Sequence, residues 1–512
     1  MSFLFVFLAF FFPFLPPSFS LPLANPPVLD TTVTETEHRT VVERLPTPVL
    51  AKESLLPYAP RAPAPSPDSP ILFLPQHSSD GAIIITDSGA AANASLGSEP
   101  LPASNSSGAG FTPLMMAYYP GWVANNFPPE RIDFSRFDWI DFAFAEPDEN
   151  FVLNLYGSDI LSRLVNVTHQ CGKNVKLSIG GWSGSKQVNL TPYGPALTPR
   201  LRYFSLAVQN DTSRHTFVDN IVDIYHEHNL DGIDIDWEYP GTKGHPQNLV
   251  HPTDSANLLE FFKLLRTKLP PTARITAAVQ TTPFAGVDGQ PLNDVRAFAG
   301  VLDWVVLMNY DVWGGASVWH LPTLPFHLIW LEASSNPGPN APLDDNACRN
   351  SSQPTANAKA AVEAWEAAGF PPDQLVLGLP SYGYISRSSA THLYQRDGNP
   401  SLPRAYAVTD EGADTGQVQF RDLVPQVLCK DPTRPGVYVG RDGFTREWDE
   451  CSSTPFAYSG EQVVTYDDPQ SLGRKSAFAK QYNLRGVNIF DVHGDTDEWE
   501  LVDSVRQALG LL

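Results

Sequence analysis

From about residue 111 to the C-terminus, short apolar runs alternate with longer segments in which apolar residues recur every three or four positions. Short apolar runs are typical of buried strands, and the longer spacing is typical of amphipathic helices. Helical spacing is present at residues 213–229, in the segment that begins at Asp254, and at residues 356–368, where Gly369 ends the helix. The strand pattern occurs eight times, at residues 113–119, 139–145, 174–180, 232–238, 274–280, 303–310, 375–382 and 486–491.

Strands that alternate with helices predict a parallel sheet covered by helices, and eight such units predict an α/β fold, a closed (β/α)8 TIM barrel. In that fold the catalytic residues lie at the C-terminal ends of the strands. The connection from Tyr384 to Val464 is too long for a plain link between a strand and a helix. We therefore expect a small folded insertion at about residues 385–464.

The N-terminal residues 2–20 are almost wholly apolar, and Ala24 offers a small residue for cleavage. This pattern predicts a secretory signal peptide at residues 1–24 and hence a secreted, extracellular protein. A membrane anchor is disfavoured, because prolines at positions 13, 16 and 17 interrupt the apolar stretch. Residues 25–110 are rich in Pro, Ser, Thr and Ala, which predicts a disordered linker or stalk before the folded domain at residues 111–512.

The segment 231–238 reads Asp-Gly-Ile-Asp-Ile-Asp-Trp-Glu and sets acidic residues against large apolar ones with a period of two. Side chains two apart on a strand share a face, so Asp234, Asp236 and Glu238 point one way and the apolar residues between them point the other. Asp231 has the opposite parity and is expected at the strand entrance. Carboxyl groups crowded in a low-dielectric site raise one another's pKa, and carboxyl groups with separated pKa values suit acid catalysis at a glycosidic bond.

Two other interpretations of this segment are weaker. A calcium-binding loop also has Asp at alternate positions, but it needs Gly at its sixth position and polar residues between the ligands. Counted from Asp234, the sixth position is Tyr239, and the intervening residues are Ile and Trp. A solvated acidic edge strand does not alternate with such apolar side chains. We therefore expect no metal site here.

The acidic segment matches the pattern Asp-x-x-Asp-x-Asp-x-Glu and resembles the signature of glycoside hydrolase family 18, the chitinases. Other stretches resemble motifs of the same family in the right order: Lys-Leu-Ser-Ile-Gly-Gly-Trp at 176–182, Met-Asn-Tyr-Asp at 308–311, Gly-Leu-Pro-Ser-Tyr-Gly at 378–383 and Tyr-Asp-Asp-Pro at 466–469. The resemblance covers roughly residues 111–512. It implies a (β/α)8 catalytic domain with an α+β insertion domain between strand 7 and helix 7.

The resemblance implies catalytic roles for four residues. Glu238 is expected to be the general acid that protonates the glycosidic oxygen, while the N-acetyl oxygen of the substrate acts as the nucleophile and the configuration is retained. Asp236 would hold the acetamido N–H and stabilise an oxazolinium-like intermediate, and Asp234 would share a proton with Asp236. Tyr310 would donate its hydroxyl to the acetamido oxygen and so fix the geometry of attack.

Further residues are expected to support this site. Ser178 is expected beneath the acidic strand, as a hydrogen-bond partner of Asp231 or Asp234; a purely structural role at the strand end is the alternative. Met308 and Asp311 belong to the same motif as the catalytic tyrosine, and they favour a place for that tyrosine in the site.

Aromatic residues near the strand ends are expected to stack on sugar rings. Gly180 and Gly181 are expected to let the chain turn tightly at the barrel rim beside them. The expected substrate contacts, which include one glycine, are Tyr119, Trp122, Phe144, Gly181, Trp182, Tyr239, Trp313 and Phe490.

Two positions depart from the family pattern. The family usually places Trp where Phe490 stands, as the floor of the sugar site that is distorted in catalysis. A smaller ring has less contact area and no N–H donor, so we expect an altered turnover or substrate range. Tyr384 stands where Arg or His is usual, which puts the nearby sugar contacts in question.

The formal net charge of −22 argues against nucleic acids and anionic membranes as partners, because both bind clustered Lys and Arg. A neutral or cationic polymer fits this charge better. Together with the resemblance, this indicates chitin or chito-oligosaccharides as the partner. We expect a monomer that needs no cofactor and does not bind a membrane once its signal is removed.

The four cysteines are Cys171, Cys348, Cys429 and Cys451, an even number without metal-like spacing, and they predict two disulfides. Three pairings are possible. Cys429 with Cys451 is preferred because both lie in the inserted segment, and this choice leaves Cys171 with Cys348. Glycosylation sequons fit the same secretory route; they are at Asn93, Asn105, Asn166, Asn189, Asn210 and Asn350.

The function expected from these observations is that of a secreted chitinase, which hydrolyses β-1,4 bonds between N-acetylglucosamine units by substrate-assisted catalysis. One alternative is a chitin-binding, lectin-like relative that kept the barrel and lost activity, although such relatives usually lack the acid and Glu238 is present. Another is an endo-β-N-acetylglucosaminidase acting on N-glycans. The resemblance favours chitin over glycans, because family members that act on glycans tend to lack the insertion and the Met-x-Tyr-Asp motif.

Overall fold

The computed structural model describes residues 111–185, 203–242, 244, 248, 250–312, 337–345, 348, 356–388, 390–391, 393, 416–434, 436–460 and 462–512. The expected signal peptide, the expected linker, Trp313 and the sequons at positions 93, 105, 189 and 350 lie outside these residues. Among the helices of the described ranges, none is long and apolar enough to span a lipid bilayer.

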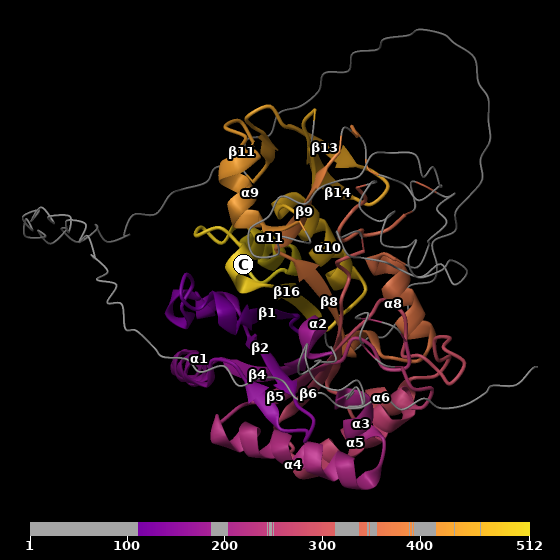
Figure 1. Ribbon diagram of the computed structural model, residues 1–512. Helices are drawn as coiled ribbons and strands as arrows, with labels where there is room; N and C mark the ends of the chain where they lie inside the picture. The colour runs from indigo at the N-terminus through magenta and orange to yellow at the C-terminus, as the bar shows by residue number, and fades with distance from the viewer. Residues whose placement is uncertain are drawn as a thin grey trace, which may run out of the picture. The chain divides into compact units, whose positions relative to one another are not determined.

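Eight strands form a closed parallel barrel at the centre of the described structure (Figure 1). Each strand pairs in parallel with the next around the ring, and β1 pairs with both β2 and β16, which closes the sheet. The predicted (β/α)8 barrel is therefore confirmed. Its strands are β1 (Leu114–Pro120), β2 (Trp139–Pro147), β4 (Asn174–Gly180), β5 (Gly232–Asp236), β6 (Arg274–Val279), β7 (Trp304–Leu307), β8 (Leu375–Pro380) and β16 (Gly486–Phe490).

Several barrel strands end earlier than their sequence pattern indicated, and in two of them this places a candidate catalytic residue beyond the strand. β5 ends at Asp236, so Glu238 lies just beyond the strand. β7 ends at Leu307, so Tyr310 lies in the segment that follows. Both residues are thus placed after the C-terminal ends of their strands, where barrel enzymes carry their chemistry.

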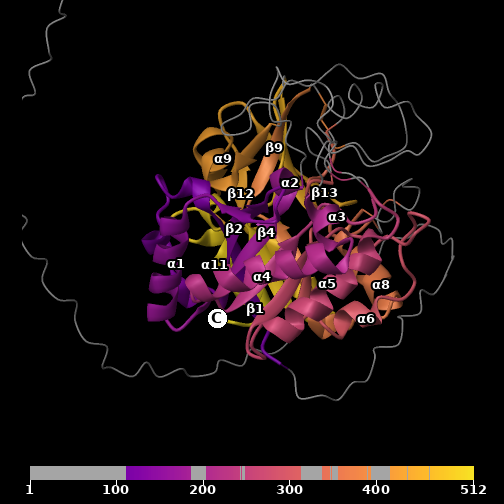
Figure 2. The same ribbon diagram turned by 60° about the horizontal axis from the view of Figure 1, so that its bottom comes forward.

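Most of the helices pack around the barrel, whereas α9 packs against β10 and β11 of the insertion (Figure 2). In α4 the predicted stripe of Phe217, Ile221 and Tyr225 is buried. Polar side chains cap several helix starts; the Asn210 side chain, for example, accepts from Ser213 N at the start of α4. The helices are α1 (Ser158–Gln170), α2 (Gly181–Gly184), α3 (Tyr203–Val208), α4 (Asp211–Glu227), α5 (Asp254–Lys268), α6 (Arg296–Ala299), α8 (Ala358–Ala367), α9 (Phe420–Gln426), α10 (Pro469–Gln481) and α11 (Glu500–Leu509).

Between β8 and α10 the chain forms a second, antiparallel sheet, drawn in orange and yellow in Figure 1. Its strand order is β10-β9-β15-β14-β13, and a separate hairpin, β11–β12, follows helix α9. This is an α+β arrangement at the place where the sequence indicated an insertion. The strands are β9 (Tyr382–Arg387), β10 (Gln417–Gln419), β11 (Leu428–Lys430), β12 (Tyr438–Gly440), β13 (Thr445–Asp449), β14 (Thr454–Tyr458) and β15 (Gln462–Thr465), while the short β3 (Leu153–Leu155) pairs with β2.

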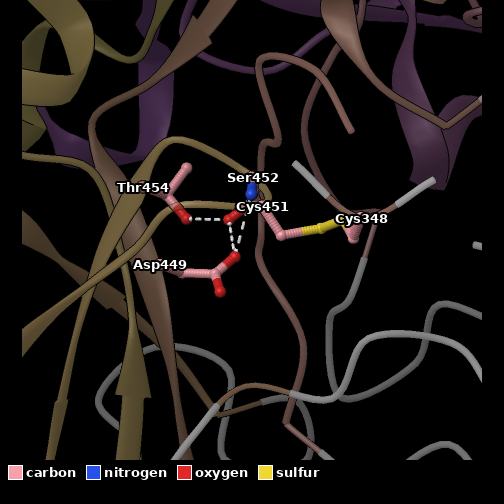
Figure 3. The surroundings of a disulfide bond; sticks show 5 residues. All are labelled: Cys348, Asp449, Cys451, Ser452 and Thr454. Atoms are coloured by element: carbon pink, nitrogen blue, oxygen red, sulfur yellow. Dashed lines mark hydrogen bonds between the residues drawn. A yellow bond between two sulfur atoms is a disulfide. The ribbon is translucent and has the colours of Figure 1, made fainter. Parts of the chain in front are cut away.

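A disulfide joins Cys348 to Cys451, with Cα atoms 5.4 Å apart (Figure 3). Cys171 and Cys429 are unbridged, so the predicted pairing of Cys429 with Cys451 is wrong, and so is that of Cys171 with Cys348. Cys429 lies on β11 in the separate hairpin, whereas Cys451 lies in the turn between β13 and β14. The segment before α8 reaches that turn, where Leu343 N donates to Ser452 O at 2.9 Å.

Replacing both bridged cysteines by serine is expected to lower the free energy of unfolding by ~2–4 kcal/mol, because the bond closes a long loop in the unfolded chain. The two residues are 103 positions apart. Denaturant unfolding of Cys348→Ser/Cys451→Ser against the wild type measures the loss. Cys171→Ser is the matched control, since that thiol is exposed and unbridged; an equal loss in the control would contradict the assignment.

Candidate active site

The acidic segment lies on β5 with its carboxyl groups toward the barrel axis. Asp234 and Asp236 are buried, whereas Glu238, just beyond the strand, is partly exposed. The apolar residues between them join the core outside the barrel, where Trp237 stacks on Phe204 with ring centroids 5.3 Å apart. Because alternate side chains of a strand point to opposite faces, the three acids share the inner face.

Hydroxyl groups from three other strands hold the Asp234 carboxylate. Tyr118 Oη and Ser178 Oγ donate to Asp234 Oδ2 at 3.1 and 2.9 Å, and Thr276 Oγ1 donates to Asp234 Oδ1 at 2.5 Å. Of the two partners expected for Ser178, the structure therefore gives Asp234. With both oxygens bonded, this carboxylate is fixed in place.

Asp231 lies at the opposite, N-terminal end of β5. Its Oδ2 accepts from Val175 N at 2.8 Å and lies 2.8 Å from His169 Nε2. These contacts join β5 to the entrance of β4 and to α1. Asp231 therefore lies away from the acidic cluster, and none of the contacts given above supports that cluster. Residues at this end of a barrel contribute to stability.

The environment of the two outer acids raises their pKa values. Burial raises the pKa of Asp236 well above its usual range, and the charges of Glu238 and Asp234 raise it further. Burial also raises the pKa of Glu238 to about 8, the charge of Asp311 adds to this, and a hydrogen bond with Tyr239 opposes it. At neutral pH Glu238 therefore keeps its proton, as a general acid must. Among the described residues, no cluster of His, Cys, Asp and Glu is arranged to hold a metal ion.

Tyr310 lies beyond the end of β7 and is almost completely buried. It belongs to a buried cluster with Tyr382 and Tyr384, and Met308 and Phe490 pack against this cluster. Burial raises the pKa of the Tyr310 hydroxyl, and the charge of Asp236 is the largest of the carboxylate contributions to the rise. The phenol therefore stays protonated beside the acidic strand and is available as a hydrogen-bond donor.

Asp311 is held between two tyrosines from the first strand of the insertion. Tyr382 Oη and Tyr384 Oη donate to Asp311 Oδ1 at 2.7 and 2.5 Å. The Asp311 backbone has a φ of +58°, and its N–H donates to Asn340 Oδ1 at 2.8 Å. The departure at Tyr384 therefore supplies a hydroxyl to this carboxylate, where an Arg or His would supply a cation.

Two glycines let β4 turn at the rim of the barrel. A Cβ on Gly180 would lie 2.1 Å from Asp236 O, and a Cβ on Gly181 would lie 2.7 Å from the Phe144 ring. Their φ angles of +117° and +74° also favour glycine. Trp182 follows directly and is 43% exposed.

Phe490 is the centre of an aromatic cluster at the end of β16. Its ring centroid lies 5.4 Å from that of Tyr118, 6.5 Å from that of Phe144, and 6.2 Å from those of Tyr310 and Tyr382. Phe490 and Phe144 are both partly exposed. The ring therefore lies beside Tyr310, at the C-terminal end of the barrel strands.

The other expected sugar contacts differ in accessibility. Trp122 is 56% exposed and its ring lies 6.2 Å from that of Phe144, which extends the aromatic surface. Tyr119 is fully buried and donates its hydroxyl to Phe127 O at 2.7 Å, so its expected contact with substrate is wrong. Trp313 lies outside the described residues.

Comparisons with known proteins agree with this geometry. The sequence model of Glycosyl hydrolases family 18 matches residues 115–495. The chain belongs to this family. A chitinase-like effector of Moniliophthora roreri is 32% identical over 78% of this chain and 93% of the relative. The crystal structure of the chitinase RmChi1 from Rhizomucor miehei is 31% identical, with a TM-score of 0.61 over 77% of this chain and 99% of that one.

Chitinase A1 of Niallia circulans is a more distant relative of this family 18 chain, 26% identical over 65% of the chain and 42% of the relative. The family and these matches make the protein a glycoside hydrolase of the chitinase type. Its relatives include proteins named chitinase and proteins named chitinase-like effector.

Several residues of this family 18 site were not found from the sequence. Tyr118 and Thr276 both bond to Asp234, but nothing in their local sequence marks them. Asn340 donates from Nδ2 to Tyr382 O at 3.2 Å and accepts from Asp311 N.

Asp311→Asn is expected to move the alkaline limb of the profile of kcat/KM against pH to lower pH, by about 1 unit. The charge of Asp311 raises the pKa of Glu238, and the proton of Glu238 is lost as the pH rises through that pKa. Activity is therefore present below the pKa and lost above it, and a lower pKa brings the loss to lower pH. The amide keeps an oxygen for the tyrosine hydroxyls. An alkaline limb at its wild-type position would refute this coupling.

Proposed function

We propose that the protein is a secreted chitinase that hydrolyses β-1,4 bonds between N-acetylglucosamine units, with retention of configuration, by substrate-assisted catalysis. The observation that carries the proposal is the partly exposed Glu238, which keeps its proton at neutral pH at the end of a strand that also carries Asp236. The family and the chitinases among the relatives support chitin as the substrate. Secretion rests on the signal peptide expected at residues 1–24.

In the first step Glu238 gives its proton to the glycosidic oxygen as the bond from that oxygen to the anomeric carbon breaks. The acetamido carbonyl oxygen of the same sugar attacks the anomeric carbon from the other side and forms a cyclic oxazolinium ion. Asp236 is suited to accept the acetamido N–H and to balance the positive charge, because its Oδ1 is buried and accepts no hydrogen bond from the described residues.

Two other groups orient this step. Tyr310 keeps its proton and would donate a hydrogen bond to the acetamido oxygen, which fixes the angle of attack. Asp234 would share a proton with Asp236 as a coupled pair. A water molecule then opens the ring, with the Glu238 carboxylate as the base, and the configuration at the anomeric carbon is retained.

The proposal is tested by the wild type on fully acetylated and fully deacetylated oligomers of the same length, with products separated by chromatography. The acetylated oligomer is expected to be cleaved and the deacetylated one left intact, since it has no acetamido group. Comparable cleavage of both would rule out substrate assistance. Release of glycans from a denatured glycoprotein in place of chitin cleavage would indicate an endo-β-N-acetylglucosaminidase.

A chitin-binding protein without activity is the second candidate. Its support is the name chitinase-like effector, which two relatives in the genus Moniliophthora share, and Phe490 in place of the family's usual Trp. Incubation with N-acetylglucosamine oligomers separates the two candidates. An enzyme converts them to shorter products, whereas a binding protein returns them intact and gives a stable heat of binding in calorimetry.

A further inference from the structure

The barrel interior below the acidic cluster contains a buried lysine. Lys176 on β4 is fully buried, and its Nζ donates to Thr276 Oγ1 at 2.7 Å. The same Nζ lies 3.3 Å from Asp141 Oδ2 and 4.8 Å from the centre of the Trp304 ring. Barrel interiors are mostly filled by bulky apolar side chains, and a buried cation is costly unless it is paired. Packing alone therefore does not explain a lysine at this position.

The direction of the hydrogen bonds links this lysine to the acidic strand. An ammonium group only donates, so Thr276 Oγ1 must accept from Lys176. The single hydroxyl proton of Thr276 then forms the hydrogen bond to Asp234 Oδ1, at 2.5 Å. That oxygen must therefore accept. The Lys176 Nζ itself lies 4.0 Å from Asp234 Oδ1, close enough for its charge to act on the carboxylate directly.

We propose that Lys176 is a positioning residue that favours the carboxylate form of Asp234, directly and through Thr276, and so biases the proton shared by the acidic pair toward Asp236 before the substrate binds. The inference deepens the proposed function and rests on it, because an acetamido N–H and an oxazolinium ion meet Asp236 only in that reaction. Lys176 touches no substrate in this account. It acts at the base of the cluster, two positions before Ser178 on the same face of β4.

The alternative explanation is that Lys176 is only the counter-ion of Asp141 and has a purely structural role. Asp141 Oδ2 also accepts from Asn488 Nδ2 at 2.8 Å, and the lysine lies closer to Asp141 than to Asp234. Burial raises the pKa of Asp141 to about 6, and the charge of Lys176 opposes the rise. The other titratable groups of this interior are Tyr118 from β1, Asp236 from β5 and Tyr310 after β7.

Lys176→Met and Lys176→Met/Asp141→Asn separate the two readings, because the double variant removes the buried anion together with its cation. If Lys176 acts on Asp234, both variants move the acidic limb of the profile of kcat/KM against pH upward by ~1–3 units, since Asp234 is then easier to protonate. A double variant with the wild-type limb would overturn the proposal and leave the lysine as the counter-ion of Asp141.

Thr276→Val keeps the cation and nearly the same volume but breaks the link to Asp234. The acidic limb is expected to move in the same direction by a smaller amount, so the proposal stays testable if Lys176→Met does not fold. An unmoved limb in Thr276→Val would overturn the role given to Thr276. The matched control is Lys475→Met on α10, another fully buried lysine, paired with Asp467; it is expected to lose stability without any shift of the limb.

A second readout does not depend on hydrolysis. Infrared difference spectra recorded during acidification report the carbonyl band of each carboxylic acid as it forms, and Asp234→Asn assigns the band of Asp234. In Lys176→Met that band is expected to appear at higher pH than in the wild type. If the wild type cleaves nothing and the band still moves, the proposed function fails while the coupling stands. A band that does not move would overturn the coupling itself.

Discussion

Glu238→Gln is expected to lower kcat/KM for soluble N-acetylglucosamine oligomers by about 10²–10⁴-fold, the range that a general acid contributes. The amide has almost the same shape as the carboxylic acid but has no acidic proton for the glycosidic oxygen. Glu238 is partly exposed and keeps its proton at neutral pH. The replacement therefore removes the acidic proton and leaves the packing nearly unchanged. Initial rates with a soluble oligomer measure the loss.

The control for this loss is Glu260→Gln on α5, where an exposed carboxylate pairs with Lys263 at 2.8 Å. It is expected to keep wild-type rates, since exposed ion pairs contribute little to stability. Glu238→Gln itself is expected to bind the oligomers with unimpaired affinity. If Glu238→Gln kept most of the activity, another residue would be the acid.

Asp236→Asn is expected to lower kcat by about 10²–10³-fold with little change in KM, the size of effect seen when one electrostatic contact to a transition state is removed. An asparagine oxygen still accepts an N–H, but it cannot carry the negative charge that balances an oxazolinium ion. The effect should therefore fall on the chemical step. Steady-state rates over a range of oligomer concentrations separate kcat from KM.

Asp236→Asn should be at least as stable as the wild type, so a loss of activity in this variant would not be due to unfolding. The pKa of Asp236 is raised in the folded protein, mainly by burial. The folded state then binds this proton more tightly than the unfolded state does, so stability falls as the pH rises through the raised pKa. An amide never ionises and avoids that cost above the raised pKa. A variant that is both inactive and unfolded at neutral pH would contradict this account of the site.

The barrel and its acidic strand could be predicted because local patterns determine them. Each barrel strand is a run of apolar residues, and the alternation in 231–238 assigns the acids to one face without knowledge of the neighbours. Glu238 and Tyr310 could likewise be placed near strand ends. The disulfide could not be predicted, because Cys348 and Cys451 are brought together by the loop before α8 and a turn of the insertion, and sequence distance carries no such information.

The two tyrosines of β1 show a second limit. Tyr118 and Tyr119 are both buried, and nothing in their residue types tells which one faces the barrel axis; the pairing of β1 with β2 and β16 decides it. Lys176 shows the opposite case. It shares its parity with Ser178, which was placed beneath the acids, so the same rule places the lysine inside the barrel as well. A polar residue with that parity therefore indicates a polar side chain inside the barrel.

Substrate assistance is tested most directly by an aryl chitobioside series in which the acetyl group next to the scissile bond carries zero, one, two or three fluorine atoms. Fluorine withdraws electrons from the acetamido oxygen and makes it a weaker nucleophile, while the leaving group stays the same. The account predicts that kcat/KM of the wild type falls steeply with each added fluorine. Equal values across the series would contradict attack by the acetamido group and with it the roles assigned to Asp236 and Tyr310.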